Sequence, residues 1–375
     1  MKRRLYSEKE WLPVGVPHVF LLDAFWGCDR YDPENNYRQV TASYFRDASS
    51  IFEMVATLAE SDAALLPMDW HDTISKPQLA ALAQRIFTTA RLGGKPVIVF
   101  LICDAPIKVN WPPHALVIRI AVHRSWRQPN EHIIPQWSKD YIQDEQGGVL
   151  VTREKALCPV VGFCGYAPPL GMRWSRQKLK ETLRLFAYYA GLAKWAPTRT
   201  AHAARVRALL ELRKSPLVEC NFLIREQSAF ANSMGAFLPG GSVEAARVRR
   251  REFVNNLVAS DYVLCSRGWA NCNIRFYEAL SAGRIPVLVD TDCVLPYEGL
   301  IDWEKYCVIV KESELADIGR QVSAFHSGLS SAEFVARQKA CHQLYHEWLG
   351  PQGFFSHVHL LLKPFKENGF IFGTE

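Results

Sequence analysis

One stretch of the sequence, residues 261–295, constrains the fold more than any other because it reads as a strand, a helix and a second strand in succession. It opens with the apolar run Tyr262–Cys265, passes a Ser-Arg-Gly turn and reaches an Asn-rich segment that can cap a helix beginning near Asn273. Gly283 suits the left-handed conformation that follows a last helical turn, and Pro286 opens the second apolar run. The pattern is typical of an α/β protein with an open parallel sheet.

Polar residues in the loop and first turns of this unit could bind a nucleotide. In an open parallel sheet the loops at the carboxyl ends of the strands line the ligand crevice, and a helix amino terminus there presents free N–H groups to an anion. Arg267 lies in the loop, and Arg275 and Glu278 share one face of the helix. The guanidinium would suit phosphate and the carboxylate would suit ribose hydroxyls. The alternative, a surface Arg–Glu pair on an ordinary α/β unit, stays open on spacing alone.

Four motifs follow one another along this stretch and beyond it. They are a Cys-x-Arg-Gly turn at 265–268, an Asn-x-Arg-x-x-Glu-Ala helix at 273–279, a Gly-x-Ile-Pro-Val strand at 283–287, and Leu-Pro-Tyr with Asp-Trp at 295–297 and 302–303. In this order they resemble the carboxyl-terminal half of the exostosin-like glycosyltransferases. Weaker similarities at 61–70 and 117–137 extend the resemblance over most of the chain, and it is strongest over about the last third before the tail.

The resemblance implies a GT-B architecture, two Rossmann-like lobes facing a cleft, and an inverting transfer from a nucleoside diphosphate sugar, expected to be a UDP-sugar. The acceptor would be a saccharide or a lipid-linked glycan, in polysaccharide or glycoconjugate synthesis. The diphosphate would be bound by Arg267, Gly268, Asn273 and Arg275, and the ribose would be bound by Glu278. Arginines and a helix dipole can take the role of a metal in this fold, so no metal or other cofactor is expected.

Inversion in one displacement needs a general base in the first lobe and positive charge on the leaving diphosphate. The candidates for the base are Asp69, His71 and Asp72, which follow the apolar strand predicted at 63–66. Asp29, in a polar loop, is the reserve. The sequence does not rank these residues.

A chain of 375 residues is too long for one typical core and fits two domains. We predict an N-terminal Rossmann-like acceptor-side domain over 1–155, a C-terminal Rossmann-like nucleotide-sugar domain over 156–348, and a tail, 349–375, that packs back on the first. Strands are predicted at 19–25, 63–66, 96–102 and 117–121, and helices at 51–59, 77–92 and 174–195.

Composition narrows the function classes. With 49% hydrophobic and 22% charged residues the chain is globular, and a net charge of +6 suits anionic small substrates or an anionic membrane surface more than nucleic acid. Ten cysteines without a paired spacing predict free thiols in a reducing compartment. No signal peptide or membrane span is evident. Since animal members of the family are Golgi-anchored, we expect a cytoplasmic, bacterial relative, with peripheral association at the inner face of the membrane as an option.

Two further patterns have the spacing of metal sites, but we expect other roles for them. Asp290 and Asp292 form a D-x-D motif that could chelate a cation, yet they follow the Gly-x-Ile-Pro-Val strand and are expected to be loop residues. His342 and His346 have zinc-pair spacing without the intervening glutamate, so a surface pair is expected.

Two other functions stay open. One is a catalytically silent pair of lobes that binds a polysaccharide or a partner enzyme. The other is a nucleic-acid role for the arginine run 247–251, although a solvated helix face is the commoner explanation of such a run.

Overall fold

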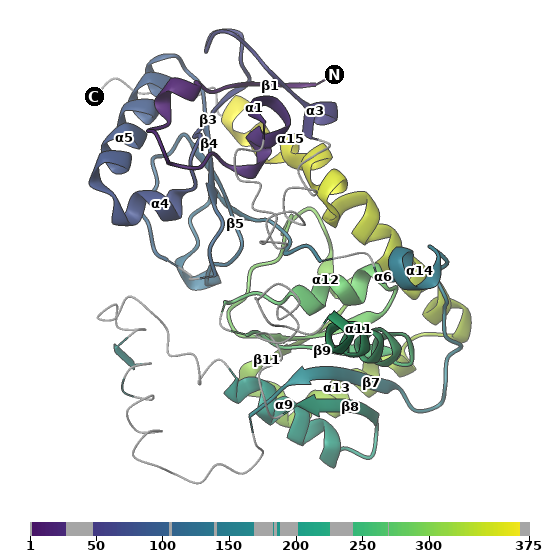
Figure 1. Cartoon of the computed structure of the whole chain (residues 1–375). Coiled ribbons are helices and arrows are strands. Elements are labelled where there is room, and N and C mark those ends of the chain that lie inside the picture. Colours follow the sequence, from purple (N-terminus) through teal and green to yellow (C-terminus); the bar gives the residue numbers. More distant parts are fainter. Residues whose placement is uncertain are drawn as a thin grey trace.

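Two separate parallel sheets form the framework of the protein (Figure 1). The structure, a computed structural model, describes residues 2–27, 48–104, 107–138, 141–168, 183, 186–187, 202–225, 243–268 and 270–367. Helices alternate with strands along both halves of the chain. The predicted two-lobed α/β fold is therefore confirmed, and we call the two sheets with their helices the N lobe and the C lobe.

The N lobe contains a six-stranded sheet in the order β2-β1-β3-β4-β5-β6. Its strands are β1 (Arg3–Tyr6), β2 (Phe52–Met54), β3 (Ala63–Leu65), β4 (Val97–Leu101), β5 (Ala115–Arg119) and β6 (Glu131–Ile133). The helices are α1 (Asp23–Trp26), α3 (Ala48–Ile51), α4 (Trp70–Ser75) and α5 (Pro77–Leu92). The next helix, α6 (Tyr141–Gln146), lies beside the C lobe (Figure 1). Each of the central strands β3, β4 and β5 is fully buried, which explains their continuous apolar sequences.

The C lobe contains a five-stranded sheet in the order β11-β10-β9-β7-β8. Its strands are β7 (Val160–Tyr166), β8 (Glu219–Arg225), β9 (Tyr262–Cys265), β10 (Ile285–Asp290) and β11 (Val308–Lys311). The helices are α9 (Ala203–Lys214), α11 (Val243–Val258), α12 (Ile274–Ser281), α13 (Ile318–Ser327), α14 (Ser331–Leu344) and α15 (Pro351–Glu367), with a π-helical turn at Tyr345–Leu349.

Both sheets follow the same winding rule. In each, the first strand lies between the second and the third, so the direction of winding reverses beside the first strand. Ligands of open α/β sheets bind at this switch point, outside the carboxyl ends of the strands. The topology alone therefore marks two places: the ends of β1 and β3 in the N lobe, and the ends of β7 and β9 in the C lobe.

Several predicted elements need correction. The apolar run 19–25 is not a strand: it forms a 3-10 turn at Phe20–Leu22 followed by α1. A short apolar run does not distinguish a buried strand from a buried turn of helix, and here Leu21 and Leu22 are buried by the second arrangement. The true first strand, β1, has one buried residue, which left no apolar run to find.

The segment predicted as a helix at 51–59 instead contains β2, an edge strand of three residues. Its pairing with β1 overrides the weak helical pattern. The predicted strands at 63–66, 96–102 and 117–121 and the helix 77–92 correspond to β3, β4, β5 and α5. The helix predicted at 174–195 and Asp29 lie outside the described residues, apart from three positions within that helix.

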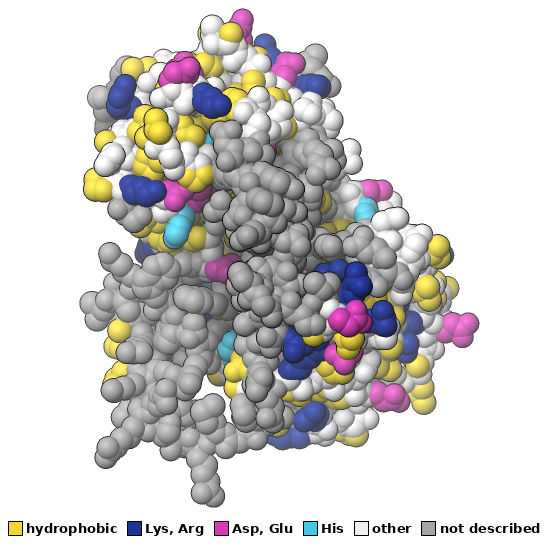
Figure 2. All heavy atoms as spheres, viewed as in Figure 1, with side chains coloured by type: hydrophobic (Ala, Val, Ile, Leu, Met, Phe, Trp, Pro, Cys, Tyr) yellow, Lys and Arg dark blue, Asp and Glu magenta, His cyan; other side chains and the backbone are white. Residues whose placement is uncertain are grey.

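The arginine run 247–251 lies on α11, and Figure 2 shows Lys and Arg side chains over the part of the C lobe where α11 lies. Arg247 is exposed and approaches Glu244 at 3.8 Å on the same helix. This helix face is solvated and carries both signs of charge. No helix in the described part of the chain combines the length and apolarity that crossing a bilayer requires.

The last helix, α15, runs from the C lobe to the N lobe (Figure 1). Phe355 is buried, with its ring 5.9 Å from Phe52 of β2 and 5.8 Å from Trp137. On the C-lobe side, the hydroxyl of Tyr297 donates to the carbonyl of Phe354. A single apolar cluster includes residues of both sheets and of α15.

This packing predicts that Phe355→Ala destabilises the whole chain. Removing a buried aromatic ring from a packed site costs about 3–5 kcal/mol of unfolding free energy. We expect a single lowered midpoint in urea, measured by circular dichroism and by tryptophan fluorescence. Val248→Ala, at an exposed position of α11, is the control and should stay within about 0.5 kcal/mol of wild type. A Phe355→Ala midpoint equal to that of the control would show that α15 does not contribute to stability.

Candidate functional site

At the switch point of the C lobe, one buried arginine binds the ends of both flanking strands. Arg205 of α9 is 8% exposed, and its guanidinium donates to the carbonyls of Tyr166 (2.9 Å), Ser266 (3.1 Å) and Arg267 (2.8 Å). Burial, with a smaller contribution from Arg275, lowers the pKa of Arg205 to about 9. The guanidinium thus fixes the backbone after β7 and after β9 in one geometry.

The loop after β9 leads into α12 as predicted. Asn273 is the N-cap: its side-chain oxygen accepts from the N–H of Arg275 at 3.0 Å, and its amide donates to the carbonyl of Ser266 at 2.8 Å. Gly283 has φ +63°, and a Cβ there would lie 2.7 Å from the side chain of Leu150 and 3.0 Å from the carbonyl of Gln338. Only glycine suits this end of the helix. At Gly268, by contrast, a Cβ would have nothing nearer than Arg205 at 3.9 Å.

Arg275 reaches from α12 to the end of β7. Its Nη2 donates to the carbonyl of Cys164 at 2.7 Å, and its guanidinium lies 4.8 Å from the ring centroid of Phe163 and 5.9 Å from that of Phe253. A Cβ at Gly165 would be only 2.7 Å from the same Nη2, so the absence of a side chain there allows this approach. The arginine is half-buried and cannot be a freely moving surface residue.

Glu278 is also buried, at 7% exposure. The hydroxyl of Tyr141, from α6, donates to its carboxylate at 3.3 Å. Burial raises the pKa of Glu278, and Arg275, Tyr141 and Ser138 oppose that rise. The alternative of a surface Arg–Glu pair does not describe these residues, because Glu278 is buried beside the segment that connects the lobes and Arg275 is half-buried.

Arg267 completes a positively charged group at the ends of β7 and β9. It is 7% exposed. Burial lowers the pKa of His123 and of His202, and the charge of Arg267 lowers both further. Together with Arg205 and Arg275 it brings three guanidinium groups to one switch point. Such a cluster beside a helix amino terminus is suited to a phosphate group.

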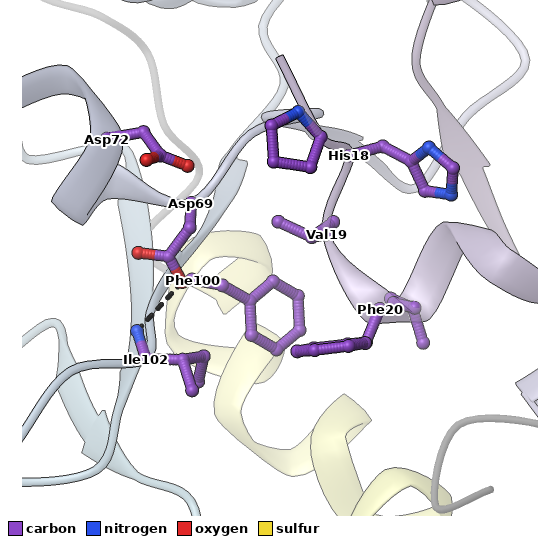
Figure 3. Close-up of a pocket in the computed structure, with 9 residues that line it drawn as sticks. His18, Val19, Phe20, Asp69, Asp72, Phe100 and Ile102 are labelled. Atoms are coloured by element: carbon purple, nitrogen blue, oxygen red, sulfur yellow. Dashed lines mark hydrogen bonds between the residues drawn. The ribbon is translucent and has the colours of Figure 1, made fainter. Parts of the chain in front are cut away.

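At the switch point of the N lobe there is a small open pocket (Figure 3). Its walls come from the loop after β1, the loop after β3 and the end of β4. The lining residues are Pro17, His18, Val19, Phe20, Leu21, Asp69, Asp72, Phe100 and Ile102. The pocket thus lies where the topology expects a ligand.

Asp69 lines this pocket and has a raised pKa. It caps α4 by accepting from the N–H of His71 at 2.8 Å, and it accepts from the N–H of Ile102 at 2.9 Å, the dashed line in Figure 3. Burial raises its pKa to about 6, with a further rise from Asp72, while the two backbone hydrogen bonds lower it. Asp72 also lines the pocket, whereas the side chain of His71 is exposed and does not.

The D-x-D residues are occupied by protein donors. Asp290 accepts from the N–H of Cys293 at 2.8 Å, and Asp292 accepts from the hydroxyl and the N–H of Ser125. Within the described ranges, no three His, Cys, Asp or Glu side chains are grouped so that they could hold a metal. His342 lies on α14, where its Nδ1 contacts the carbonyl of Ser281, and His346 lies in the π-helical turn with its ring 4.3 Å away. All nine cysteines in the described part of the chain are free.

Sequence reasoning missed several residues of these sites. Arg205 and Tyr141 each lie in short, ordinary-looking helices, and their roles depend on contacts across 61 and 137 positions of sequence. The pocket wall at 17–21 is not predicted, because the apolar run 19–25 in the sequence indicates a strand. For Arg205 a signal existed, since an arginine within a largely apolar helix face needs acceptors.

Comparison with known proteins finds one matching family model and several partial relatives. Residues 166–325 match the family model of the exostosin GT47 domain, and this segment contains every predicted donor-binding residue. A probable glucuronosyltransferase, GUT1, of Oryza sativa subsp. japonica is 39% identical over 57 residues, which is 15% of this chain and 14% of the relative. A probable beta-1,4-xylosyltransferase, IRX10, of Arabidopsis thaliana has the same identity, length and coverage. Exostosin-1 of Drosophila melanogaster is 37% identical over 78 residues, or 20% of this chain and 10% of that protein.

The matched stretches therefore span about a seventh or less of these curated relatives. Among solved structures, the calicheamicin glycosyltransferase CalG4 is similar over 92% of this chain and 85% of its own, with a TM-score of 0.31 and 12% identity. The matches support a glycosyltransferase, and within that class they support the exostosin-like family. The named relatives are plant and animal proteins, so the expected bacterial origin has no support.

Proposed function

We propose that this chain is an inverting glycosyltransferase that transfers a sugar from a UDP-sugar to a saccharide or lipid-linked glycan acceptor without a metal. The observation that supports this best is that each lobe has a charged group at its switch point. The C lobe presents three arginines at one, and the N lobe presents a half-buried carboxylate, Asp69, in a pocket at the other. A displacement with inversion requires these two components: a cationic site for a leaving diphosphate and a base for an acceptor hydroxyl.

In the proposed reaction, the acceptor hydroxyl oxygen attacks the anomeric carbon as the bond from that carbon to the diphosphate oxygen breaks. Asp69 takes the proton of the attacking hydroxyl. The diphosphate leaves with its added negative charge beside Arg267, Arg275 and the start of α12, near Asn273 and the Gly268 backbone. Glu278 would accept from the ribose hydroxyls. Asp72, which lines the same pocket, is the second candidate for the base.

This function places the protein in polysaccharide or glycoconjugate synthesis, with a nucleotide sugar and a glycan as its partners. We further propose a cytoplasmic location, peripheral at the inner face of the membrane, on the basis of the unpaired cysteine spacing and the positive net charge. A catalytically silent pair of lobes is the alternative. Hydrolysis of UDP-sugars by the purified chain would separate the two, because a silent protein should show none.

The first prediction concerns the ribose. Replacing Glu278 by Gln should weaken UDP binding about ten- to a hundredfold, because a charged acceptor is worth about 1.5–3 kcal/mol to its hydrogen bonds. The size of the side chain and one acceptor oxygen are retained, so the thermal midpoint should change little. Calorimetric titration with UDP, with other nucleotides as controls, measures the first quantity.

Tyr141→Phe is the matched control for Glu278, since it removes the hydroxyl that Glu278 accepts from but no proposed donor contact. It should leave UDP affinity close to wild type. Unchanged UDP affinity in Glu278→Gln together with a large fall in midpoint would show that Glu278 is a structural partner of Tyr141 and Arg275.

The second prediction concerns pH. A general base must be ionised, and the pKa of Asp69 is raised to about 6. The ionised fraction, and with it kcat/KM, should therefore fall about tenfold per unit as pH drops below about 6, and should level off above about 7. Asp69→Asn should lower kcat by about 10²- to 10⁴-fold with little change in UDP affinity. Asp72→Asn is the comparison: if it removes the acid limb while Asp69→Asn retains activity, the base is Asp72.

The third prediction concerns metal. If arginines neutralise the leaving diphosphate, transfer should persist in excess EDTA, and Asp292→Asn should change the rate only slightly. Initial rates with and without EDTA, and with manganese added back, give the answer. Activity that EDTA abolishes and manganese restores would identify the D-x-D carboxylates as a chelating site instead.

A further inference from the structure

Two loops from different lobes interlock beside the C-lobe site. Residues 123–127 follow β5 in the N lobe, and residues 290–298 follow β10 in the C lobe. His123 and Cys293 form an isolated antiparallel bridge, and the N–H of Arg124 donates to the carbonyl of Asp292 at 2.9 Å. We call these two loops the clasp.

The carboxylate of Asp292 is the main acceptor of the clasp. The hydroxyl of Ser125 donates to it at 2.6 Å, and the N–H of Ser125 approaches its two oxygens at 3.2 and 3.3 Å. Asp292 has φ +68°, a conformation that Asp and Asn adopt more readily than other residues with side chains. Glu298 adds a second acidic contact, at 2.8 Å from Arg127 and 3.1 Å from Arg124.

The clasp encloses a histidine. His123 is 1% exposed, and its Nδ1 lies 3.2 Å from the amide nitrogen of Asn271, which also donates to the carbonyl of Asp292 at 2.8 Å. The hydroxyl of Thr291 donates to the oxygen of the same amide at 2.7 Å, which orients the amide with its nitrogen towards His123. With Nδ1 as the acceptor, the imidazole is neutral and carries its proton on Nε2.

The same amide connects the clasp to the proposed donor site. Asn271 lies between Arg267 and Asn273 in the loop from β9 to α12, and it is 2% exposed. Its contacts with His123 and with the carbonyl of Asp292 hold this loop on the clasp. Burial, and then the charge of Arg267, lower the pKa of His123 to about 4, while Asp292, whose Oδ2 lies 3.6 Å from Nδ1 of His123, opposes that fall.

We propose that Asp292 is a positioning residue for donor binding: by holding loop 123–127 on the C lobe, it fixes Asn271 and with it the loop that carries Arg267. This inference rests on the proposed function, because it takes the diphosphate of the donor as the ligand of Arg267. Asp292 itself would not touch the donor. Its effect on donor binding should therefore pass through the loop that carries Arg267.

The size of the effect follows from the population of the closed clasp. A ligand that binds one conformation has an apparent Kd that rises in inverse proportion to the fraction of that conformation. If loss of the Asp292 carboxylate leaves the clasp closed about a tenth of the time, UDP binding weakens about tenfold. The open state should also expose loops 123–127 and 290–298 together.

A double-mutant cycle tests the proposal. UDP affinity is measured by calorimetry for wild type, Asp292→Ala, Arg267→Ala and the double variant. We expect Asp292→Ala to weaken binding about tenfold and Arg267→Ala to weaken it more. The double variant should lose less affinity than the sum of the two single losses, because a residue through which Asp292 acts is already absent. Asp292→Asn, which keeps an acceptor and tolerates the backbone conformation, should recover most of the affinity.

Two further variants and one structural measurement test whether misfolding explains a loss of UDP affinity. Ser125→Ala removes the 2.6 Å contact without altering the backbone at 292 and should weaken UDP in the same direction. Asp302→Ala, at an exposed surface pair with Lys305, should have no effect. Amide hydrogen exchange should show faster exchange in both clasp loops of Asp292→Ala, and unchanged exchange in β3 and β4.

The outcomes separate the two proposals. Additive losses in the double variant, or an Asp292→Ala protein with wild-type UDP affinity and a lowered midpoint, would reduce the clasp to a structural contact. An Asp292→Asn protein as impaired as Asp292→Ala would contradict the role of the acceptor oxygen. If wild type binds no nucleoside diphosphate, the proposed function fails and donor positioning with it, while hydrogen exchange still shows whether Asp292 closes the clasp.

Discussion

The buried guanidinium of Arg205 is the interaction on which the C-lobe site depends. Its three acceptors are carbonyls at the end of β7 and in the loop after β9, two segments with no direct sequence connection. A buried charge without acceptors would be strongly unfavourable, so the loop is held in the one conformation that satisfies the guanidinium. The same conformation presents the carbonyl of Ser266 to Asn273 and so fixes where α12 begins.

From that starting point the remaining charges are placed by ordinary packing. The first turn of α12 carries Arg275 to the end of β7, where the ring of Phe163 and the carbonyl of Cys164 hold it. One turn later, Glu278 is buried beside Tyr141. Carbonyls and an aromatic ring thus orient Arg205 and Arg275. The charge of Arg275 also acts on Glu278, where it opposes the rise in pKa that burial causes.

The sequence predicted those parts of the fold that depend on local pattern. The unit from β9 to β10, the cap at Asn273 and the turn at Gly283 could all be predicted, because each depends on residues a few positions apart. The edge strand β2 and the turn at Phe20–Leu22 were misread, since their structure depends on pairing with β1 and on burial that short runs do not reveal. For the candidate site, the sequence predicted the residue types but not their contact partners. Nothing near Glu278 in the sequence indicates its contact with Tyr141.

Asp292 shows why a motif does not determine a role. Two carboxylates after a strand can chelate a cation only if their oxygens converge and lack competing donors. Here Oδ1 of Asp290 accepts from the N–H of Cys293, and the oxygens of Asp292 accept from Ser125 of the other lobe. The left-handed backbone at Asp292 turns its carboxylate towards the N lobe, where an N–H and a hydroxyl meet it. In this structure the motif therefore makes a contact between the lobes, and a cation would have to displace these protein donors to bind.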